Sequence, residues 1–290
     1  MADEIGEIQY LLSCGDKSSK CSGYSSLLHF QEHATVNPSS LRSLSFSSHS
    51  IVSSLISDIS NPDEEISAQA LKCLGFMIYH PSIVSSLPLD DVNLVLESLP
   101  KLITTTKLKS ACNLGVWCIS VQQLGESLLA THFHSLLLAI VHALDNPMGS
   151  LSTTFEATQA VMKLCGQLSK QMRDSSHIWA PPIYRRLLST DKRERDASER
   201  CLLKVKTEVI PPSLDLSKVL AKDMKSKLLS GMNKLLDKGM KIQVIQAWGW
   251  FIRMLGSHAF KTRQLVNDSL KILECTFTDL DPQVQIATLV

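Results

Sequence analysis

The sequence lacks any long uninterrupted apolar run. Although 44% of its 290 residues are hydrophobic, no window of about 18 residues is apolar throughout, which excludes an ordinary membrane-spanning helix. The first ten residues, MADEIGEIQY, are acidic and lack the basic region that precedes the apolar stretch of a secretory signal, and they do not resemble a transit peptide. We therefore expect a soluble intracellular protein with no membrane partner.

A disulfide framework is also missing. A secreted chain would keep its cysteines at framework spacings, whereas here they are scattered and several fall on apolar helical stripes. The eight cysteines are Cys14, Cys21, Cys73, Cys112, Cys118, Cys165, Cys201 and Cys275. This distribution favours the reducing interior of the cytosol or nucleus.

Catalytic signatures are absent as well. The sequence contains no G-x-S-x-G, H-E-x-x-H, G-x-G-x-x-G or complete P-loop motif. Cys112, Cys118, His132 and His134 could be gathered into a zinc set. Two thiolates spaced C-x5-C on one helix do not converge as those of a C-x2-C turn do. We therefore expect neither an enzyme nor a protein with a metal or other cofactor.

What the chain does contain is one helix pattern that recurs six times. An acidic or polar start, often with proline, leads into an amphipathic run with alanine, and such runs open near residues 64, 109, 154, 191, 239 and 282. These starts are 45, 45, 37, 48 and 43 residues apart. HEAT and armadillo repeats have a period of about 40–47 residues, with helical segments stacked side by side. With two helical segments per period and no strand signal, the pattern predicts an all-α solenoid of about six helical pairs.

The second repeat shows this pattern most clearly. A helix near 47–59 ends before Asn61, and the acidic run at 63–65 stands where a helix N-terminus favours negative charge. The apolar positions that follow recur every three or four residues and predict one buried face. They are Ile66, Ala70, Cys73, Leu74, Met77 and Ile78. Gly75 within this helix suggests that a neighbouring helix approaches its backbone closely.

Later repeats predict further core residues. We expect one buried stripe of Leu114, Trp117 and Val121, and another of Ala157, Val161, Leu164 and Leu168. The four tryptophans, Trp117, Trp179, Trp248 and Trp250, lie in apolar runs, so we expect them to pack in the core rather than to stack on bases. The pairs Pro181-Pro182 and Pro211-Pro212 predict turns between helices, because proline is tolerated only near a helix start.

The two ends of the chain differ from the repeats between them. Residues 1–46 are rich in serine, with short helices expected near 3–13 and 24–33. Terminal solenoid repeats are atypical, so we expect an irregular helical cap over 1–46 and the solenoid over 47–290. The serine-rich run at 37–50 is either a linker or the lead-in to the next helix. Residues 279–290 begin another helix and stop before a polar cap, so we expect a truncated product, a partial gene model or a fragment of a longer protein.

Charge is unevenly distributed, although the net charge is only +1. Residues 1–145 hold 7 basic and 14 acidic side chains, whereas residues 146–290 hold 22 and 14. The candidates for contact with DNA phosphates are Arg185, Arg186, Lys192, Arg193, Lys204, Lys218, Lys222 and Lys225. The last three recur at helical spacing and share one face. The alternative is that these basic side chains form a solvated outer face. Acidic residues between 191 and 199 would then partly balance their positive charge.

One segment resembles a known family. Residues 67–83, SAQALKCLGFMIYHPSI, are similar to a segment near the start of telomere-associated Rap-interacting factors of the Rif-one type, which carries the pattern A-L-x-x-L-G-F-x-x-Y-x-P-x-I. The matching positions are Ala70, Leu71, Leu74, Gly75, Phe76, Tyr79, Pro81 and Ile83. Further matches keep their order downstream, at 155–157 and at Trp248, Phe251, Leu255, Gly256 and Asn267. The pattern consists of residues that we expect to pack the repeats together.

The resemblance implies a non-enzymatic nuclear scaffold at chromosomes and telomeres, which acts in telomere maintenance, replication timing and double-strand-break repair. The implied partners are chromatin or telomeric DNA and telomere or repair proteins. Proteins of this family also recruit protein phosphatase 1, but its usual docking pattern, a basic residue followed by Val or Ile and then an aromatic residue, is not found in this chain. The residues alone leave two alternatives, a cytosolic adaptor or transport carrier that binds protein segments, and a non-functional truncated product. They do not predict an oligomeric state.

Overall fold

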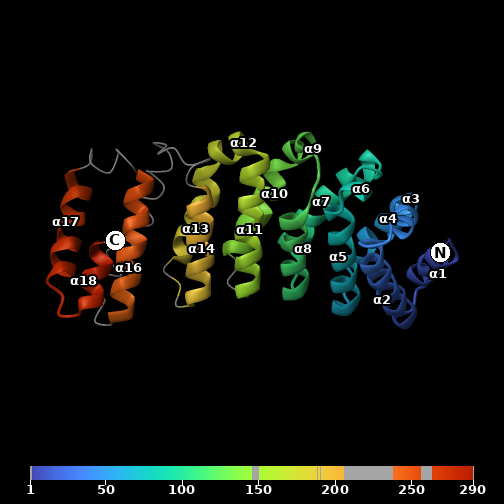
Figure 1. Ribbon diagram of the computed structural model, residues 1–290, viewed down its shortest axis with the longest axis horizontal. Coiled ribbons are helices and arrows are strands. Elements are labelled where there is room, and N and C mark those ends of the chain that lie inside the picture. Colours follow the sequence, from blue (N-terminus) through green and yellow to red (C-terminus); the bar gives the residue numbers. More distant parts are fainter. Residues whose placement is uncertain are drawn as a thin grey trace. The chain divides into compact units, whose positions relative to one another are not determined.

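The computed structural model describes residues 2–145, 150–187, 189, 191–205, 238–255 and 263–289. Every regular element within these ranges is an α-helix (Figure 1), which confirms the predicted all-α fold. Internal contacts divide the chain into two compact units, Met1–Leu168 and Ser169–Val290, and each is described by itself.

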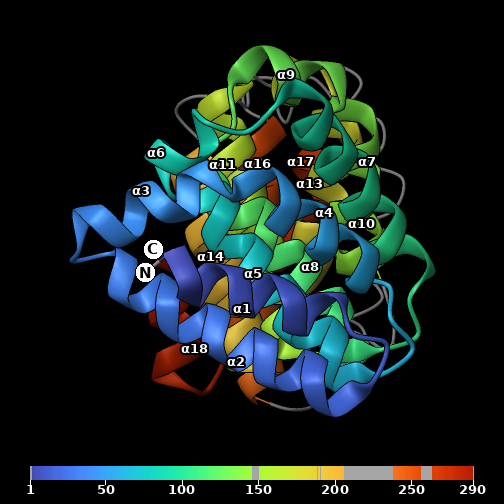
Figure 2. The same ribbon diagram turned by 90° about the vertical axis from the view of Figure 1, so that its right-hand side faces the viewer.

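The first unit is built from two layers of helices. The B layer is a row in which each helix packs against the next: α2 (Lys17–Ala34), α5 (Glu64–Tyr79), α8 (Lys109–Val121) and α11 (Leu151–Gln167). The A layer consists of α4 (Ser48–Asp58), α7 (Leu89–Thr105) and α10 (Phe133–Asp145). These three helices pack against α5, α8 and α11 respectively, and Figure 2 shows them to one side of the B layer. The unit therefore has the helix-pair stacking of a solenoid.

The serine-rich N-terminal region is helical too. Helix α1 (Ala2–Ser13) packs against α2, and α3 (Pro38–Phe46) follows α2 along the chain. Asn37 caps α3, because its side chain accepts hydrogen bonds from the backbone N–H groups of Ser39 and Ser40. The run at 37–50 is thus not a linker. Short helices also lie after α5 and α8, namely α6 (Pro81–Val84) and α9 (Glu126–Thr131). That residues 1–46 act as a cap stays a prediction.

The second unit contains the remaining helices of the described residues. They are α12 (Ser169–Asp174), α13 (Ser176–Arg186), α14 (Lys192–Val205), α16 (Lys238–Leu255), α17 (Arg263–Phe277) and α18 (Pro282–Leu289). Helix α13 packs against α12 and α14, and α18 packs against both α16 and α17. The unit therefore repeats the pairing of adjacent helices seen in the first unit.

The predicted repeat period is confirmed. Helices α5, α8, α11, α14, α16 and α18 begin within three residues of the six predicted starts, at intervals of 41 to 46 residues. Local caps fix several of these starts. The Asp63 carboxylate accepts hydrogen bonds from the N–H groups of Glu65 and Ile66, and Ser150 forms a capping box with Thr153.

The prediction that Pro181 and Pro182 mark a turn between helices is wrong, because both lie buried inside α13. Their nitrogens cannot donate to carbonyls one turn earlier, which weakens the helix locally. Packing compensates for this loss. Trp179 and Tyr184 of the same helix are fully buried, and Trp179 Nε1 donates a hydrogen bond of 2.8 Å to the Met172 carbonyl. The other pair, Pro211-Pro212, lies outside the described residues.

Two of the three predicted core stripes are confirmed. The stripe on α5 and the stripe from Ala157 to Leu168 are buried throughout. The predicted stripe of Leu114, Trp117 and Val121 on α8 is wrong, since all three side chains are only half-buried. The buried face of α8 consists instead of Ala111, Cys112, Val116, Cys118 and Ile119. Trp117 is accordingly not a core residue, whereas the other three tryptophans are.

Candidate functional site

The cysteines and histidines considered for zinc do not form a metal site. Across the described ranges, no group of three or more His, Cys, Asp or Glu side chains is placed to hold a metal ion. Cys112 and Cys118 lie in the core, and burial raises the pKa of both thiols, which disfavours the thiolate that a metal needs.

Among the described helices, none is both long and apolar enough to cross a lipid bilayer.

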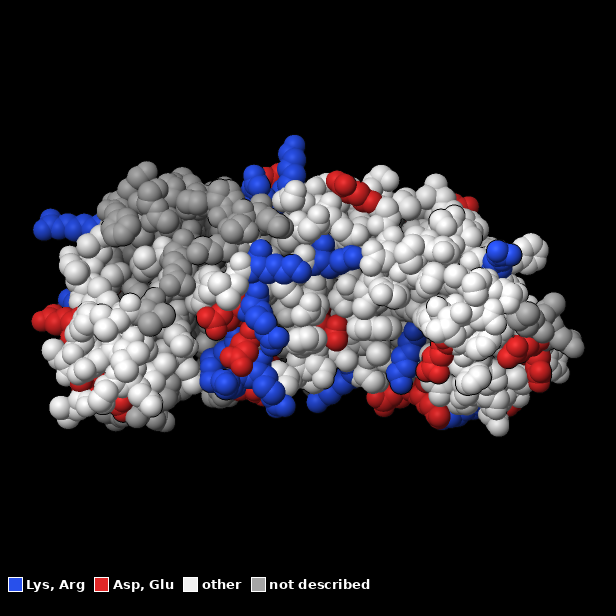
Figure 3. Space-filling view, in the orientation of Figure 1, with Lys and Arg blue, Asp and Glu red and all other residues white. Residues whose placement is uncertain are grey.

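The structure brings together the described members of the predicted basic set. Arg185 and Arg186 are half-buried at the end of α13, and Lys192, Arg193 and Lys204 are exposed on α14. Figure 3 shows basic side chains gathered over α13 and α14, with acidic side chains among them. The three remaining candidates, Lys218, Lys222 and Lys225, lie outside the described residues.

Acidic neighbours partly neutralise this basic surface. Arg186 Nη1 lies 3.3 Å from Glu194 Oε1, and Arg193 Nη2 lies 3.1 Å from Asp191 Oδ2. Hydrogen bonds from the Arg193 side chain lower the pKa of Asp191. The Arg193 side chain nevertheless remains 74% exposed. Exposed ion pairs contribute little to stability, so such an arginine can exchange its carboxylate partner for a phosphate.

Three exposed cations form a stripe along α14. Arg193, Arg200 and Lys204 are all exposed, and their spacing of seven and four residues places them on one helix face. Among the buried residues of α14, Ser198 and Leu202 lie on the opposite face of the helix. We call Arg193, Arg200 and Lys204 the α14 basic stripe. Sequence reasoning did not single out this alignment.

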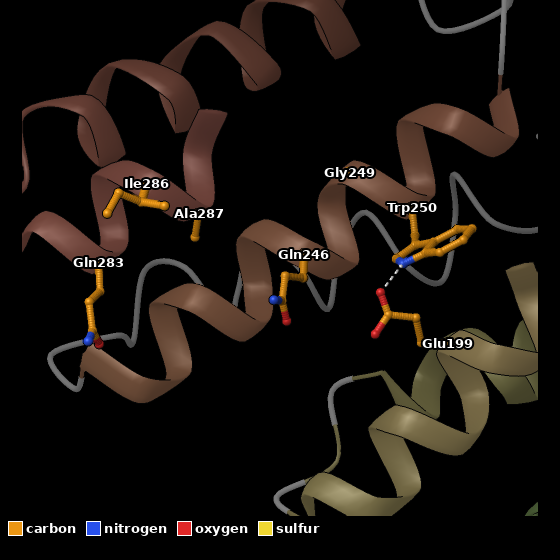
Figure 4. Close-up of a pocket in the computed structure, with 7 residues that line it drawn as sticks. All are labelled: Glu199, Gln246, Gly249, Trp250, Gln283, Ile286 and Ala287. Atoms are coloured by element: carbon orange, nitrogen blue, oxygen red, sulfur yellow. Dashed lines mark hydrogen bonds between the residues drawn. The ribbon is translucent and has the colours of Figure 1, made fainter. Parts of the chain in front are cut away.

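Between α16 and α18 lies a groove of about 380 Å³ (Figure 4). It is lined by Gln246, Gly249 and Trp250 of α16, by Gln283, Ile286 and Ala287 of α18, and by Glu199 of α14. Trp250 Nε1 donates a hydrogen bond of 3.4 Å to Glu199 Oε1, which ties α16 to α14. The indole is 4% exposed, so its contribution to the groove is mainly structural.

A second groove, of about 350 Å³, lies in the first unit between α2, α5 and α8. Its apolar walls are Leu28, Phe76, Tyr79, Trp117 and Val121. We call it the apolar groove. Sequence reasoning missed it by treating Phe76 and Tyr79 as repeat-packing residues. A signal was present, because both residues fall outside the predicted buried stripe of their helix.

Solved helical-repeat proteins share this architecture. The structure of Kap121p bound to RanGTP aligns with a TM-score of 0.62 and 14% identity, covering 94% of this chain and 25% of that one. A designed armadillo repeat protein in complex with the peptide (KR)4 aligns with a TM-score of 0.55 and 13% identity, covering 84% and 98%. At such identities the likeness shows the fold alone.

Sequence comparison gives more specific relatives. The telomere-associated protein RIF1 of Mus musculus is 24% identical over 228 residues, which make up 78% of this chain and 9% of the mouse protein. RIF1 of Homo sapiens is 24% identical over 230 residues, with the same coverage of both chains. The chain therefore spans only a small part of the length of these relatives. The family model described as Rap1-interacting factor 1 N terminal matches residues 13–290. The chain belongs to the Rap1-interacting factor 1 N-terminal family.

Proposed function

We propose that this chain is a non-enzymatic scaffold of the nucleus, located at chromosomes and telomeres. It acts in telomere maintenance, replication timing and double-strand-break repair by binding DNA or chromatin partners, including telomere and repair proteins. The observation that carries this proposal is the family match over residues 13–290, supported by relatives named telomere-associated proteins. The repeat fold fits a scaffold, because stacked repeats leave an extended surface for large partners.

The transport-carrier alternative receives no comparable support. This chain resembles Kap121p in structure at only 14% sequence identity. A shared fold does not imply a shared binding partner. Recruitment of protein phosphatase 1 is not part of the proposal, since the docking pattern is not found in the sequence.

We place DNA contact on the α14 basic stripe, with Arg185, Arg186 and Lys192 nearby. Side chains on one helix face can follow a phosphate backbone without reading bases. Such contacts release counterions, so the affinity should fall steeply as the salt concentration rises. Lys218, Lys222 and Lys225 stay candidates for DNA contact by their sequence spacing alone.

The test is a salt titration of DNA binding. Fluorescence anisotropy with a labelled duplex of telomeric repeats gives the slope of log affinity against log salt concentration. In the variant Arg193→Glu/Arg200→Glu/Lys204→Glu, we expect the magnitude of this slope to fall by about 0.9 for each phosphate contact removed.

A matched control is available in the first unit. The variant Lys101→Glu/Lys107→Glu/Lys109→Glu makes the same change in net charge at three exposed lysines. We expect it to retain most of the affinity and the slope. Equal losses of affinity in both variants would show that the effect comes only from the change in net charge. An unchanged slope in the α14 variant would overturn the DNA proposal.

A further inference from the structure

The apolar groove presents aromatic side chains that the packing of the repeats leaves uncovered. Tyr79 is 52% exposed, and Phe76 and Trp117 are half-buried. The Phe76 ring stacks on His80 with a centroid distance of 6.0 Å, which holds one wall in place. A large apolar side chain entering from outside would remove water from all three rings. That removal is the main source of affinity in concave binding sites.

The wall formed by Trp117 is preorganised. Gly75 has no side chain, so the indole of Trp117 lies directly against the backbone of α5. Any larger residue at this position would clash with the ring and force it to move. Because the ring is fixed before a ligand arrives, little conformational entropy is lost on binding.

A buried polar side chain that lines the groove favours one kind of ligand. Gln31 lines the groove and is only 1% exposed. Its Nε2 donates a hydrogen bond of 3.1 Å to the Cys73 carbonyl, which fixes the orientation of the amide. Its Oε1 has no hydrogen-bond partner among the described residues. A buried acceptor of this kind needs a donor, and the backbone N–H of an extended peptide supplies one.

The charge at one end of the groove favours a basic residue. Glu32 lies exposed on the rim, in the last turn of α2. Tyr79 and Val121 are the last residues of α5 and α8, so the C-terminal ends of both helices also border the groove. Helix C-termini carry partial negative charge. Lys72 also lies on the rim, about two helical turns before Tyr79. Its positive charge disfavours a second basic residue of the ligand near Lys72.

From these observations we infer that the apolar groove binds an extended segment of a partner protein. The segment inserts one large apolar side chain between Phe76, Tyr79 and Trp117. One of its backbone N–H groups donates to Gln31 Oε1, and a lysine or arginine next to the anchor residue pairs with Glu32. This site lies in the first unit and does not depend on DNA binding by the α14 basic stripe.

The experiment is a selection of short random peptides, displayed on phage, against the immobilised 290-residue chain. We expect enriched peptides to carry Leu, Ile, Phe or Trp adjacent to Lys or Arg. Each enriched peptide is then labelled, and its Kd is measured by fluorescence anisotropy. Tyr79→Ala removes one wall and Glu32→Lys reverses the rim charge, and each should raise the Kd by about tenfold.

Two control variants make the result decisive. Phe46→Ala removes an aromatic residue that is 94% exposed on α3, and Glu97→Lys reverses an exposed charge on α7. Both should leave the Kd unchanged. The inference is overturned if the selection enriches no such peptides, if acidic peptides dominate, or if Tyr79→Ala and Glu32→Lys bind the enriched peptides as tightly as the unmodified chain. Circular dichroism of each variant shows that its helices are retained.

Discussion

The indole of Trp117 packs directly on the backbone of Gly75. A Cβ atom added at Gly75 would stand 2.1 Å from Cζ3 and 2.4 Å from Cη2 of the indole, closer than any real contact allows. Glycine within a helix costs about 1 kcal/mol relative to alanine, so its presence in α5 needs a packing reason. The close approach of α8 is that reason, and it also shapes the apolar groove.

Gly75→Ala should therefore destabilise the protein despite the better helix propensity of alanine. Forcing the indole to move costs about 1–3 kcal/mol, as other overpacked sites do. The matched control is Gly249→Ala in α16, where an added Cβ meets nothing within 4 Å. That variant should gain about 0.5–1 kcal/mol. Urea denaturation monitored by circular dichroism measures both free energies of unfolding.

A double-mutant cycle identifies the cause. In a Trp117→Ala background the obstacle is gone, so Gly75→Ala should become neutral or stabilising. If Gly75→Ala stabilised the unmodified chain as much as Gly249→Ala does, the packing of the indole on Gly75 would be refuted.

Leu74→Ala should be strongly destabilising because Leu74 is fully buried in the B layer. Removing a buried leucine side chain costs about 2–5 kcal/mol of the free energy of unfolding.

Trp248→Ala in α16 should cost a similar amount, since Trp248 is 5% exposed and donates a hydrogen bond of 3.2 Å to Ser269 Oγ. Leu94→Ala on α7, at a side chain that is 45% exposed, is the control and should cost much less. An unchanged melting temperature in Leu74→Ala or Trp248→Ala would contradict the described core.

The starts of the helices could be predicted because capping is a local property. Asp63 and its acidic neighbours lie next to the helix that they begin, and the structure places that start at Glu64. The buried face of α8 could not be predicted in the same way. That helix carries apolar side chains on two faces, and only its packing between α5, α7 and α11 decides which one is buried.

The apolar groove could not be predicted for a related reason. Gln31 and its hydrogen-bond partner Cys73 are 42 residues apart in sequence. No local pattern therefore shows that the amide is buried, with one oxygen that has no partner in the described part of the chain.

Arg193 and Lys204 of the α14 basic stripe could be named as candidates, because charged residues are visible in the sequence, but their alignment with Arg200 was not predicted. The ion pair between Arg186 of α13 and Glu194 of α14 could not be predicted, because it depends on how these two helices pack together.

Stability at alkaline pH should depend on Tyr24. Its phenol is fully buried and donates a hydrogen bond of 2.7 Å to Asp58, which also accepts from Lys20. Burial, and next the hydrogen bond to Asp58, raise the pKa of Tyr24 well above its ordinary value of 10. The unfolded chain therefore releases this proton above pH 10 while the folded chain retains it. The contribution is fully present below that pH and is lost as the pH rises, by about 1.4 kcal/mol per pH unit.

The measurement is urea denaturation at several values between pH 9 and pH 11. The alkaline loss of stability should be smaller in Tyr24→Phe, and Tyr10→Phe is the control because Tyr10 is 69% exposed. Identical pH profiles for Tyr24→Phe and the unmodified chain would show that the buried phenol makes no such contribution.

The most direct test of the proposed role is chromatin immunoprecipitation of the tagged 290-residue chain, expressed at a native level, with telomeric repeats compared with the rest of the genome. A scaffold of telomeres and chromosomes should be enriched at telomeric repeats, and the enrichment should fall in the α14 variant Arg193→Glu/Arg200→Glu/Lys204→Glu. A cytosolic signal with no chromatin occupancy would contradict the account.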